Sequence, residues 1–143
     1  MSNTNKSVFG TADFVTRCGS YNTTSVTFAS TSIVAEIADT DCKGTLGLSG
    51  QTGLPSGTGM LFIFPQEGSY GFWMKDMKFA LDMVWVRADF SVSGIEKNVP
   101  ADSYPQTFGE KYPAQYVIEL PAGFVDAQHL SVGEKISLGV NSL

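Results

Sequence analysis

The chain has 143 residues and a mass of 15.3 kDa, which is the size of one ordinary domain. Apolar residues make up 43% of the sequence and charged residues 16%, a composition that excludes a disordered chain and a coiled coil. The net charge of −5 argues against nucleic acid as a partner, because a protein that binds the phosphate backbone needs a basic surface.

The start of the chain predicts a flexible tail followed by one domain. The first seven residues (MSNTNKS) are polar and do not form a signal peptide, so residues 1–10 are expected to be the tail and residues 11–143 a single β-rich domain. The longest apolar run, 60–64, is far shorter than the roughly 20 residues that cross a bilayer, so we expect no stable membrane insertion. Abundant Ser, Thr and Gly with little Lys favour an extracytoplasmic protein (periplasmic, cell-envelope or secreted) whose signal peptide has been removed.

The first half of the domain predicts extended segments around one short helix. The Thr- and Ser-rich residues 11–30 suit extended structure. In residues 33–38 apolar side chains alternate, which predicts a strand. Thr40 with Asp41 offers an N-cap for a short helix near residues 41–48, weakened by two glycines.

The second half predicts short strands joined by turns rich in Gly and Pro. The clearest strand is 78–87, which is apolar on both faces and should therefore be central, with 90–97 as its hairpin partner. Further strands are predicted at 59–64, 116–120 and 135–140, and a turn at 65–71. This pattern indicates a mainly β domain, either a sandwich of the jelly-roll kind or a barrel.

The two cysteines, Cys18 and Cys42, can pair in only one way within the chain. A disulfide between them would tie the N-terminal segment to the domain and stabilise it by about 3–4 kcal/mol. The alternative is two free buried thiols, which behave as small apolar side chains. Because Arg17 precedes Cys18, a functional thiol also stays open.

The sequence predicts neither a metal nor a cofactor. His129 is the single histidine, whereas a zinc or copper enzyme normally uses two or three imidazoles or thiolates. Asp39 and Asp41 form only a weak candidate for a hard cation. No nucleophile elbow accompanies His129, and the Gly-rich residues 49–59 lack the Lys-Ser/Thr of a phosphate-binding loop.

Two carboxylates, Asp82 and Glu119, interrupt apolar strands and are the candidate catalytic residues. A carboxylate among apolar neighbours needs a cation or hydrogen bonds, or its pKa rises. One hypothesis makes these carboxylates an acid/base pair with Lys75 nearby. The other makes Asp82 and Lys75 a buried structural ion pair that fixes the strand register.

Aromatic residues provide a second candidate site. Tyr70 and Trp73 lie close together in sequence, next to Lys75, and flat rings on a β-sandwich bind sugars by stacking. The candidate ligand-binding residues are therefore Trp73, Lys75, Asp82 and Tyr70. Aromatic residues at alternating positions also form apolar cores, which is the competing interpretation. The loop 100–113, rich in Pro and Tyr, is a candidate rim or lid.

Three blocks of sequence carry a family resemblance. They are EIADT (36–40) with KGTLGLSGQTGLPSGTGMLFIF (43–64), then FWMKDMKFALDMVWV (72–86), and PAQYVIELPAG (113–123) with GEKISL (133–138). With these blocks, which span about residues 33–138, the chain resembles the bacterial and archaeal family called domain of unknown function 192 (DUF192). The chain departs from the family pattern at Ser49, Gln51 and Met77, and Gln51 replaces a basic residue. The resemblance implies a compact β-rich fold and, in many members, export, but no established reaction.

These observations favour an extracytoplasmic ligand-binding or accessory domain whose ligand is a glycan or another small polar molecule. The first alternative is a carboxylate-based hydrolase, for example of glycosides, that uses Asp82 and Glu119. The second is a purely structural or protein-interaction module. A ligand-binding protein should lose affinity when Trp73 is replaced, whereas a structural charge at Asp82 should cost stability when it is removed.

Overall fold

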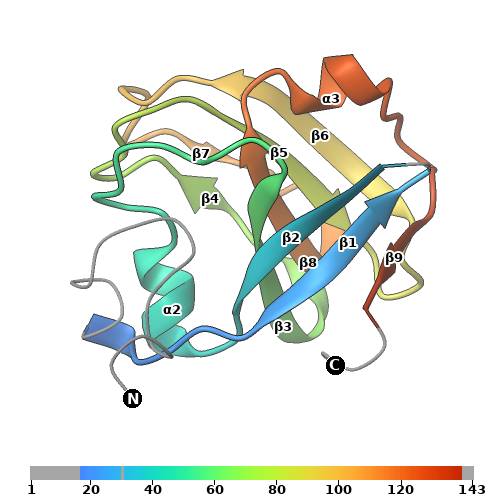
Figure 1. Cartoon of the computed structure of the whole chain (residues 1–143), viewed down its shortest axis with the longest axis horizontal. Coiled ribbons are helices and arrows are strands. Elements are labelled where there is room, and N and C mark those ends of the chain that lie inside the picture. Colours follow the sequence, from blue (N-terminus) through green and yellow to red (C-terminus); the bar gives the residue numbers. More distant parts are fainter. Residues whose placement is uncertain (1–16, 30, 140–143) are drawn as a thin grey trace.

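The alternating apolar segments form one seven-stranded sheet that curls into a half-barrel (Figure 1). This computed structural model describes residues 17–29 and 31–139. The strand order is β6-β5-β8-β3-β2-β1-β9, and β4 and β7 form a separate two-stranded sheet. The strands are β1 (Thr23–Phe28), β2 (Thr31–Ala38), β3 (Thr58–Ser69), β4 (Phe72–Trp73), β5 (Leu81–Val86), β6 (Val92–Val99), β7 (Thr107–Phe108), β8 (Pro113–Pro121) and β9 (Ile136–Leu138), and the helices are α2 (Asp41–Leu46) and α3 (Phe124–Gln128).

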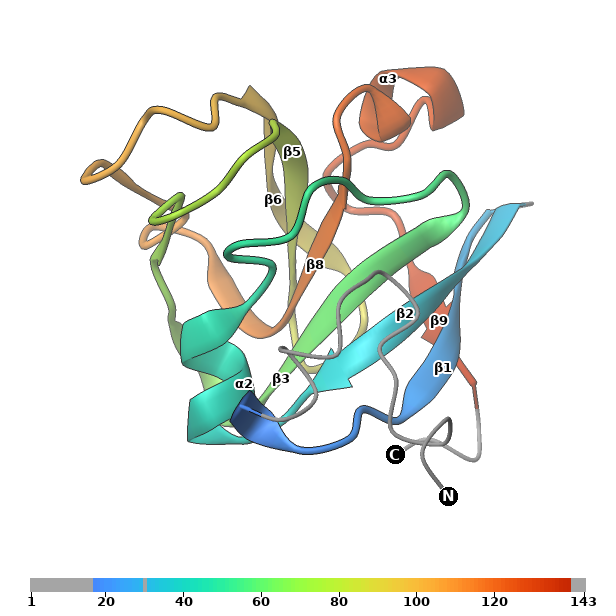
Figure 2. The same cartoon turned by 60° about the vertical axis from the view of Figure 1, so that its left-hand side comes forward.

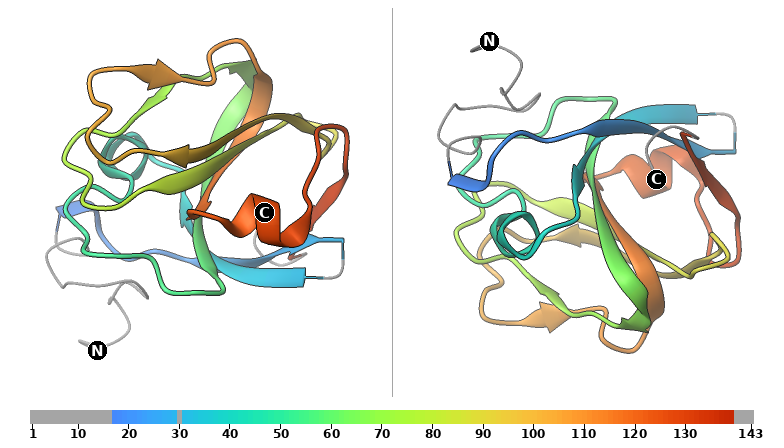
Figure 3. Two further views of the ribbon diagram at one scale, coloured as in Figure 1. Left: turned by 90° about the horizontal axis from the view of Figure 1, so that it is seen from above. Right: turned by 90° about the horizontal axis from the view of Figure 1, so that it is seen from below.

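The curl brings the two edge strands of the sheet together at one end. Ser91, just before β6, forms an antiparallel bridge with Lys135, just before β9. Val92 N donates a hydrogen bond of 2.8 Å to Glu134 O. Within the sheet the neighbours are antiparallel except β2 and β3, whose parallel pairing requires the crossover that contains α2. Figure 3 shows the curled sheet from its two ends.

Both faces of the sheet are covered, so the central strands are buried on both sides. All six residues of β5 are buried, as the sequence predicts: Val84 and Val86 face what we call the first core, and Met83 and Trp85 face the second core. The first core comprises Val26, Phe28, Ile33, Ala35, Leu61, Val84, Val86, Val92, Tyr116, Ile118, Leu120, Val125, Leu130 and Ile136. The second core comprises Ala38, Leu48, Met60, Phe62, Met74, Leu81, Met83, Trp85, Val99, Ala114 and Val117.

The structure confirms a mainly β fold with a short helix after residue 40. Thr40 caps α2 by accepting a hydrogen bond from Lys43 N, but the helix ends at Leu46 rather than 48, because Gly47 leaves the helical conformation with φ 52°. The segment that covers the second core contains α2, which lies against the first described residues, around Cys18 (Figure 2). None of the helices within residues 17–29 and 31–139 is long and apolar enough to span a membrane.

Other element boundaries differ from the sequence predictions. Strand β3 continues through the predicted turn at 65–71 as far as Ser69. Pro65, which has no N–H to donate, lies where the pairing between β3 and β8 shifts register, between Ile63 and Gly68. The strand predicted at 78–87 begins only at Leu81, and α3 was not predicted. The tail predicted at 1–10 lies outside the described residues.

Candidate functional site

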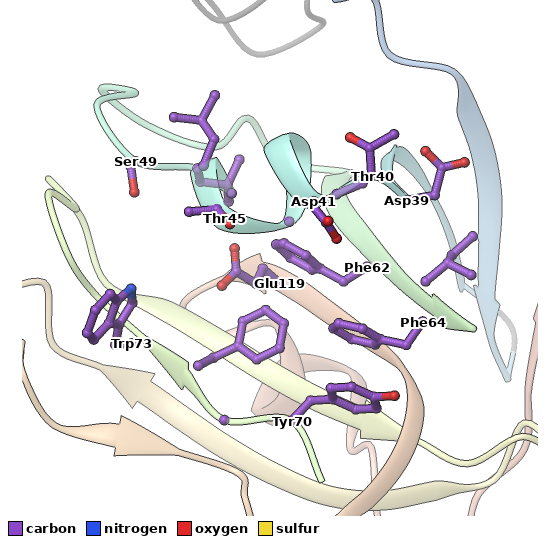
Figure 4. A pocket seen from close by; sticks show the side chains of 18 of the residues that line it. Asp39, Thr40, Asp41, Thr45, Ser49, Phe62, Phe64, Tyr70, Trp73 and Glu119 are labelled. Carbon is purple, nitrogen blue, oxygen red and sulfur yellow. The ribbon is translucent and has the colours of Figure 1, made fainter. Parts of the chain in front are cut away.

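A pocket of about 650 Å³ lies between α2 and the face of the sheet that carries the second core (Figure 4). This volume falls within the roughly 300–1,000 Å³ of small-molecule sites. Residues 38–41 and 44–49 line it from above, and residues of β3, β8 and the segment 69–73 line it from below. The parallel crossover from β2 to β3 creates the pocket, because it carries α2 across the end of the sheet.

Several local interactions hold the segment that contains α2 above the sheet. The disulfide between Cys18 and Cys42, with a Cα–Cα distance of 5.6 Å, ties α2 to the N-terminal segment and confirms the bridge suggested by the sequence. Ser49 Oγ donates a hydrogen bond of 2.8 Å to Lys75 O, and Gly50 N donates one of 2.9 Å to Asp76 O. Because α2 has only six residues, these contacts determine its position.

Glu119 lies at the floor of the pocket. Only 4% of its surface is exposed, and its carboxyl group points toward α2 in Figure 4. The Oε1 atom of this group has no hydrogen-bond partner among the described residues. Gly47 lies beside it, and a Cβ atom there would be in ordinary van der Waals contact, 3.9 Å from Oε1 and 3.5 Å from the Phe62 ring. The positive φ of Gly47 is therefore what favours glycine at this turn.

The neighbours of Glu119 on the sheet give its carboxyl group no compensating charge. Met60 on β3 and Met83 on β5 are its register partners, and Glu36 and Glu96 occupy the next positions along the same row. Burial therefore raises the pKa of Glu119 from 4.5 to about 8, since removal from water disfavours the charged form. At neutral pH this carboxyl group is mostly protonated and can both donate and accept hydrogen bonds.

Aromatic rings form the lower wall of the pocket. Phe64 and Tyr70 stack with a centroid distance of 3.8 Å, and Phe72 contacts Phe62 edge-on at 4.7 Å. Trp73 stands at the rim with 46% of its surface exposed, and Tyr104 from the loop predicted as a rim packs against it at 4.9 Å. An exposed tryptophan beside partly buried rings leaves room for a flat or apolar part of a ligand.

The exposed charged residues that line the rim of the pocket are acidic, and the basic residues lie in a neighbouring hollow. Asp39 and Asp41 are exposed and line it, and Asp41 points from α2 toward the rings in Figure 4. A second hollow of about 850 Å³ adjoins the pocket and shares five lining residues with it, Asp41, Thr45, Leu46, Ser49 and Trp73. This second hollow contains Arg17 and Lys75, whose Nζ lies 5.9 Å from the centre of the Trp73 ring.

The structure brings together part of the site predicted from the sequence. Tyr70, Trp73 and Glu119 line one pocket, and Lys75 lies beside it in the second hollow. Asp82 is not in this group. Its neighbour Met83 pairs with Glu119, so Asp82 points to the opposite face of the sheet, toward the first core.

Asp82 is fully buried, and backbone N–H groups satisfy its carboxylate. It accepts hydrogen bonds of 2.8 Å from Asn98 N and from Val125 N. The structure therefore brings Asp82 together with neither Lys75 nor Glu119, and neither an ion pair nor an acid/base pair forms there. Asn98 on β6 and Val125 in α3 supply the N–H groups, which is why no cation is needed at this carboxylate.

The sequence did not reveal the residues contributed by α2 and β3. Asp41, Gly47, Phe62 and Phe64 line the pocket, yet only the pairing of β2 with β3 places α2 over the sheet. The usable signal was the alternation of Met60, Phe62 and Phe64, which puts aromatic rings on one face. No group of three or more His, Cys, Asp or Glu residues suited to a metal ion occurs in the part of the chain that the structure describes.

Comparison with known proteins gives a family and a fold. Residues 23–138 match the model of the DUF192 family, described as "Uncharacterized ACR". A crystal structure of a candidate transcription regulator from Sinorhizobium meliloti 1021 is similar at 26% identity and a TM-score of 0.73, over 82% of this chain and 92% of that one. A protein of unknown function from Novosphingobium aromaticivorans DSM 12444 shares the fold at 23% identity and a TM-score of 0.71, over 90% of this chain and 99% of that one. No curated protein is significantly similar to the sequence.

Proposed function

The chain belongs to the DUF192 family, and from the pocket beneath α2 we propose that it binds a small polar molecule. The observation that carries this proposal is the carboxyl group of Glu119. A buried carboxyl oxygen without a hydrogen bond costs free energy, and Glu119, which lines the pocket, has no partner for its Oε1 among the described residues. A ligand hydroxyl, amide or amine in the pocket would supply the missing hydrogen bond.

The rings below and beside Glu119 indicate the rest of the ligand. Phe64, Phe72 and Tyr70 offer an apolar wall, and the exposed Trp73 offers a flat surface at the rim. The proposed ligand has a polar group directed at Glu119 and a ring or other apolar part against these side chains. A glycan unit and a small aromatic molecule both have this form.

The positions of Asp82 and Glu119 favour ligand binding over a hydrolysis reaction that would use both carboxyl groups. Hydrolysis of a glycoside by two carboxyl groups needs both of them beside the same bond. Asp82 faces the first core with both oxygens bound to backbone N–H groups, whereas Glu119 faces the pocket. This arrangement supports a structural role for Asp82 and a ligand contact for Glu119.

We propose an extracytoplasmic location and a partner other than nucleic acid. The disulfide between Cys18 and Cys42 supports an oxidising compartment.

The similar protein from Sinorhizobium meliloti is described as a candidate regulator of transcription. The net charge of −5 in this chain favours a small molecule over a phosphate backbone.

The test is a titration of the ¹⁵N-labelled chain, followed by amide NMR, with three probes: N-acetylglucosamine, 2-phenylethanol and 2-phenylethylamine. We expect at least one probe to shift amides of residues 44–49 and 70–73 while amides of residues 131–135 stay in place. Trp73→Ala should weaken that binding, and Val132→Ala, an exposed apolar residue elsewhere, should not. If none of the probes shifts the pocket amides, the pocket is not a ligand site and a structural or interaction module becomes the better interpretation.

A further inference from the structure

The charged side chains that line the pocket are all acidic. Asp39, Asp41 and Glu119 contribute carboxyl groups, and no Lys, Arg or His is found among the described residues that form the lining. Glu119 differs from the two aspartates because it is buried at the floor, its carboxyl group is directed into the pocket, and its Oε1 has no partner among the described residues. The acidic character is therefore built into the floor and is not only a property of the solvated rim.

The lysines on α2 and just after β4 have other partners. Lys43 on α2 donates a hydrogen bond of 2.6 Å to Ser20 O, with its Nζ over the Tyr21 ring. Lys75 lies over Trp73 and lines the second hollow. Within residues 17–29 and 31–139, the pocket lining thus holds a buried acid without a basic side chain to pair with it.

As far as the structure describes the chain, the surroundings of Glu119 in the pocket contain no basic side chain that would compete with a ligand for its carboxyl group. The strands beside it present Met60 and Met83, and the turn after α2 presents Gly47. The carboxyl groups around it are Asp41 from α2, and Glu36 and Glu96 further along the same row of residues across the sheet. The aromatic wall below adds ring faces, which attract cations through their electron-rich centres.

We propose that the pocket recognises a ligand with a positively charged amine, which binds Glu119 while its apolar part packs against the rings around Tyr70 and Trp73. This inference rests on the proposed function and deepens it, because it names the chemical class of the ligand. An uncharged polyol would satisfy the carboxyl group equally well and could still pack against the rings, but it would gain neither the charge–charge attraction of Asp39 and Asp41 nor the cation–π attraction of the ring faces.

Binding of such an amine should release a proton. Burial raises the pKa of Glu119 to about 8, so at neutral pH the free protein holds the carboxyl group mostly as the acid. When the ammonium group binds, the carboxyl O–H bond breaks, its electron pair stays on the carboxylate, and the proton passes to the buffer. Affinity for the amine should therefore rise with pH up to about 8, while affinity for an uncharged probe should not.

The experiment compares 2-phenylethylamine with 2-phenylethanol, which differ only in the ammonium and hydroxyl groups. Isothermal calorimetry in Tris and in phosphate, two buffers with different ionisation enthalpies, measures both affinity and proton release. We expect the amine to bind about tenfold more tightly than the alcohol, since charge-assisted hydrogen bonds are about twice as strong as neutral ones. We also expect release of most of one proton per bound amine near neutral pH.

Two variants make the result specific to Glu119. Glu119→Gln keeps the shape of the side chain and should abolish the proton release and the preference for the amine. Asp102→Asn removes one charge from an exposed residue outside the pocket and should change neither. Equal binding of amine and alcohol by the unmodified chain would overturn the inference and leave the proposed function standing. If neither of these probes binds, and N-acetylglucosamine does not bind either, the inference and the proposed function are both overturned.

Discussion

The buried carboxyl group of Glu119 makes the stability of the fold depend on pH. Its pKa in the folded chain is about 8, against an ordinary value of 4.5. Between these values the folded state holds a proton that the unfolded state has lost. The free energy of unfolding should therefore fall as the pH rises from about 4.5 to about 8, and level off above that. Since one pKa unit corresponds to about 1.4 kcal/mol, the fall amounts to several kcal/mol.

Urea unfolding at a series of pH values measures this effect. Glu119→Gln should flatten the curve in the window between the two pKa values, and it should make the chain more stable than the unmodified protein at the alkaline end. Asp102→Asn, which removes a charge that is already exposed, should keep the original slope. A slope that survives in Glu119→Gln would assign the pH dependence to another group.

Asp82 presents the opposite case, a buried carboxylate whose bonds are complete. Both oxygens accept from backbone N–H groups, so Asp82→Asn would place an N–H₂ group against one of these donors. We expect a loss of about 1–3 kcal/mol in the free energy of unfolding, with ligand binding in the pocket retained. Asp126→Asn, the same change at an exposed residue of α3, should cost far less. Loss of binding in a stable Asp82→Asn variant would contradict the structural role.

At the scale of elements, α2 depends on its attachments more than on its own sequence. An isolated helix of six residues is unstable in water, and this one contains Gly44. The disulfide closes a loop with a sequence separation of 24, for which the loop-entropy model gives about 3–4 kcal/mol. Replacing both Cys18 and Cys42 by Ser should therefore lower the melting temperature and loosen the roof of the pocket.

Hydrogen exchange distinguishes local loosening from general destabilisation. In the double Cys→Ser variant the amides of Gly44 and Gly47, which bond to Thr40 O and Lys43 O, should exchange much faster than in the unmodified chain. Amides of the central strand β5 should change only as far as global stability changes. If α2 and β5 lost protection equally, the disulfide would stabilise the whole fold without a particular role at the pocket.

The elements also show how far a sequence of this kind can be interpreted. Alternation was enough to place β2, β5 and β8, and Thr40 was enough to place the start of α2, because these signals are local. The two-residue strands β4 and β7 and the five-residue α3 exist through tertiary contacts and leave no period to detect. The alternation along each strand identified Asp82 and Glu119 as buried acids. It could not show whether they lie on the same face of the sheet, because that depends on the register between β5 and β8.

At the scale of the whole molecule, the two cores are joined by a single sheet. Side chains of β3, β5 and β8 alternate between the cores, so that Val84 belongs to the first and Trp85, its neighbour, to the second. The edges of the sheet also meet where Ser91 bridges Lys135. Disturbance of one core should therefore pass through the shared backbone to the other, and the domain should unfold in one transition.

This can be tested with a reporter in one core and a mutation in the other. Ile136, 5% exposed, lies in the first core on β9, and Trp85, fully buried, lies in the second. In a Trp73→Phe background, where Trp85 is the remaining tryptophan, Ile136→Ala should destabilise the chain by about 2–5 kcal/mol. Trp85 fluorescence and far-UV circular dichroism should then shift to lower urea by the same amount. Val132→Ala, at a residue that is 62% exposed, should leave both curves in place. A Trp85 transition that stayed where it was while the circular dichroism curve moved would show that the cores unfold separately, despite the strands they share.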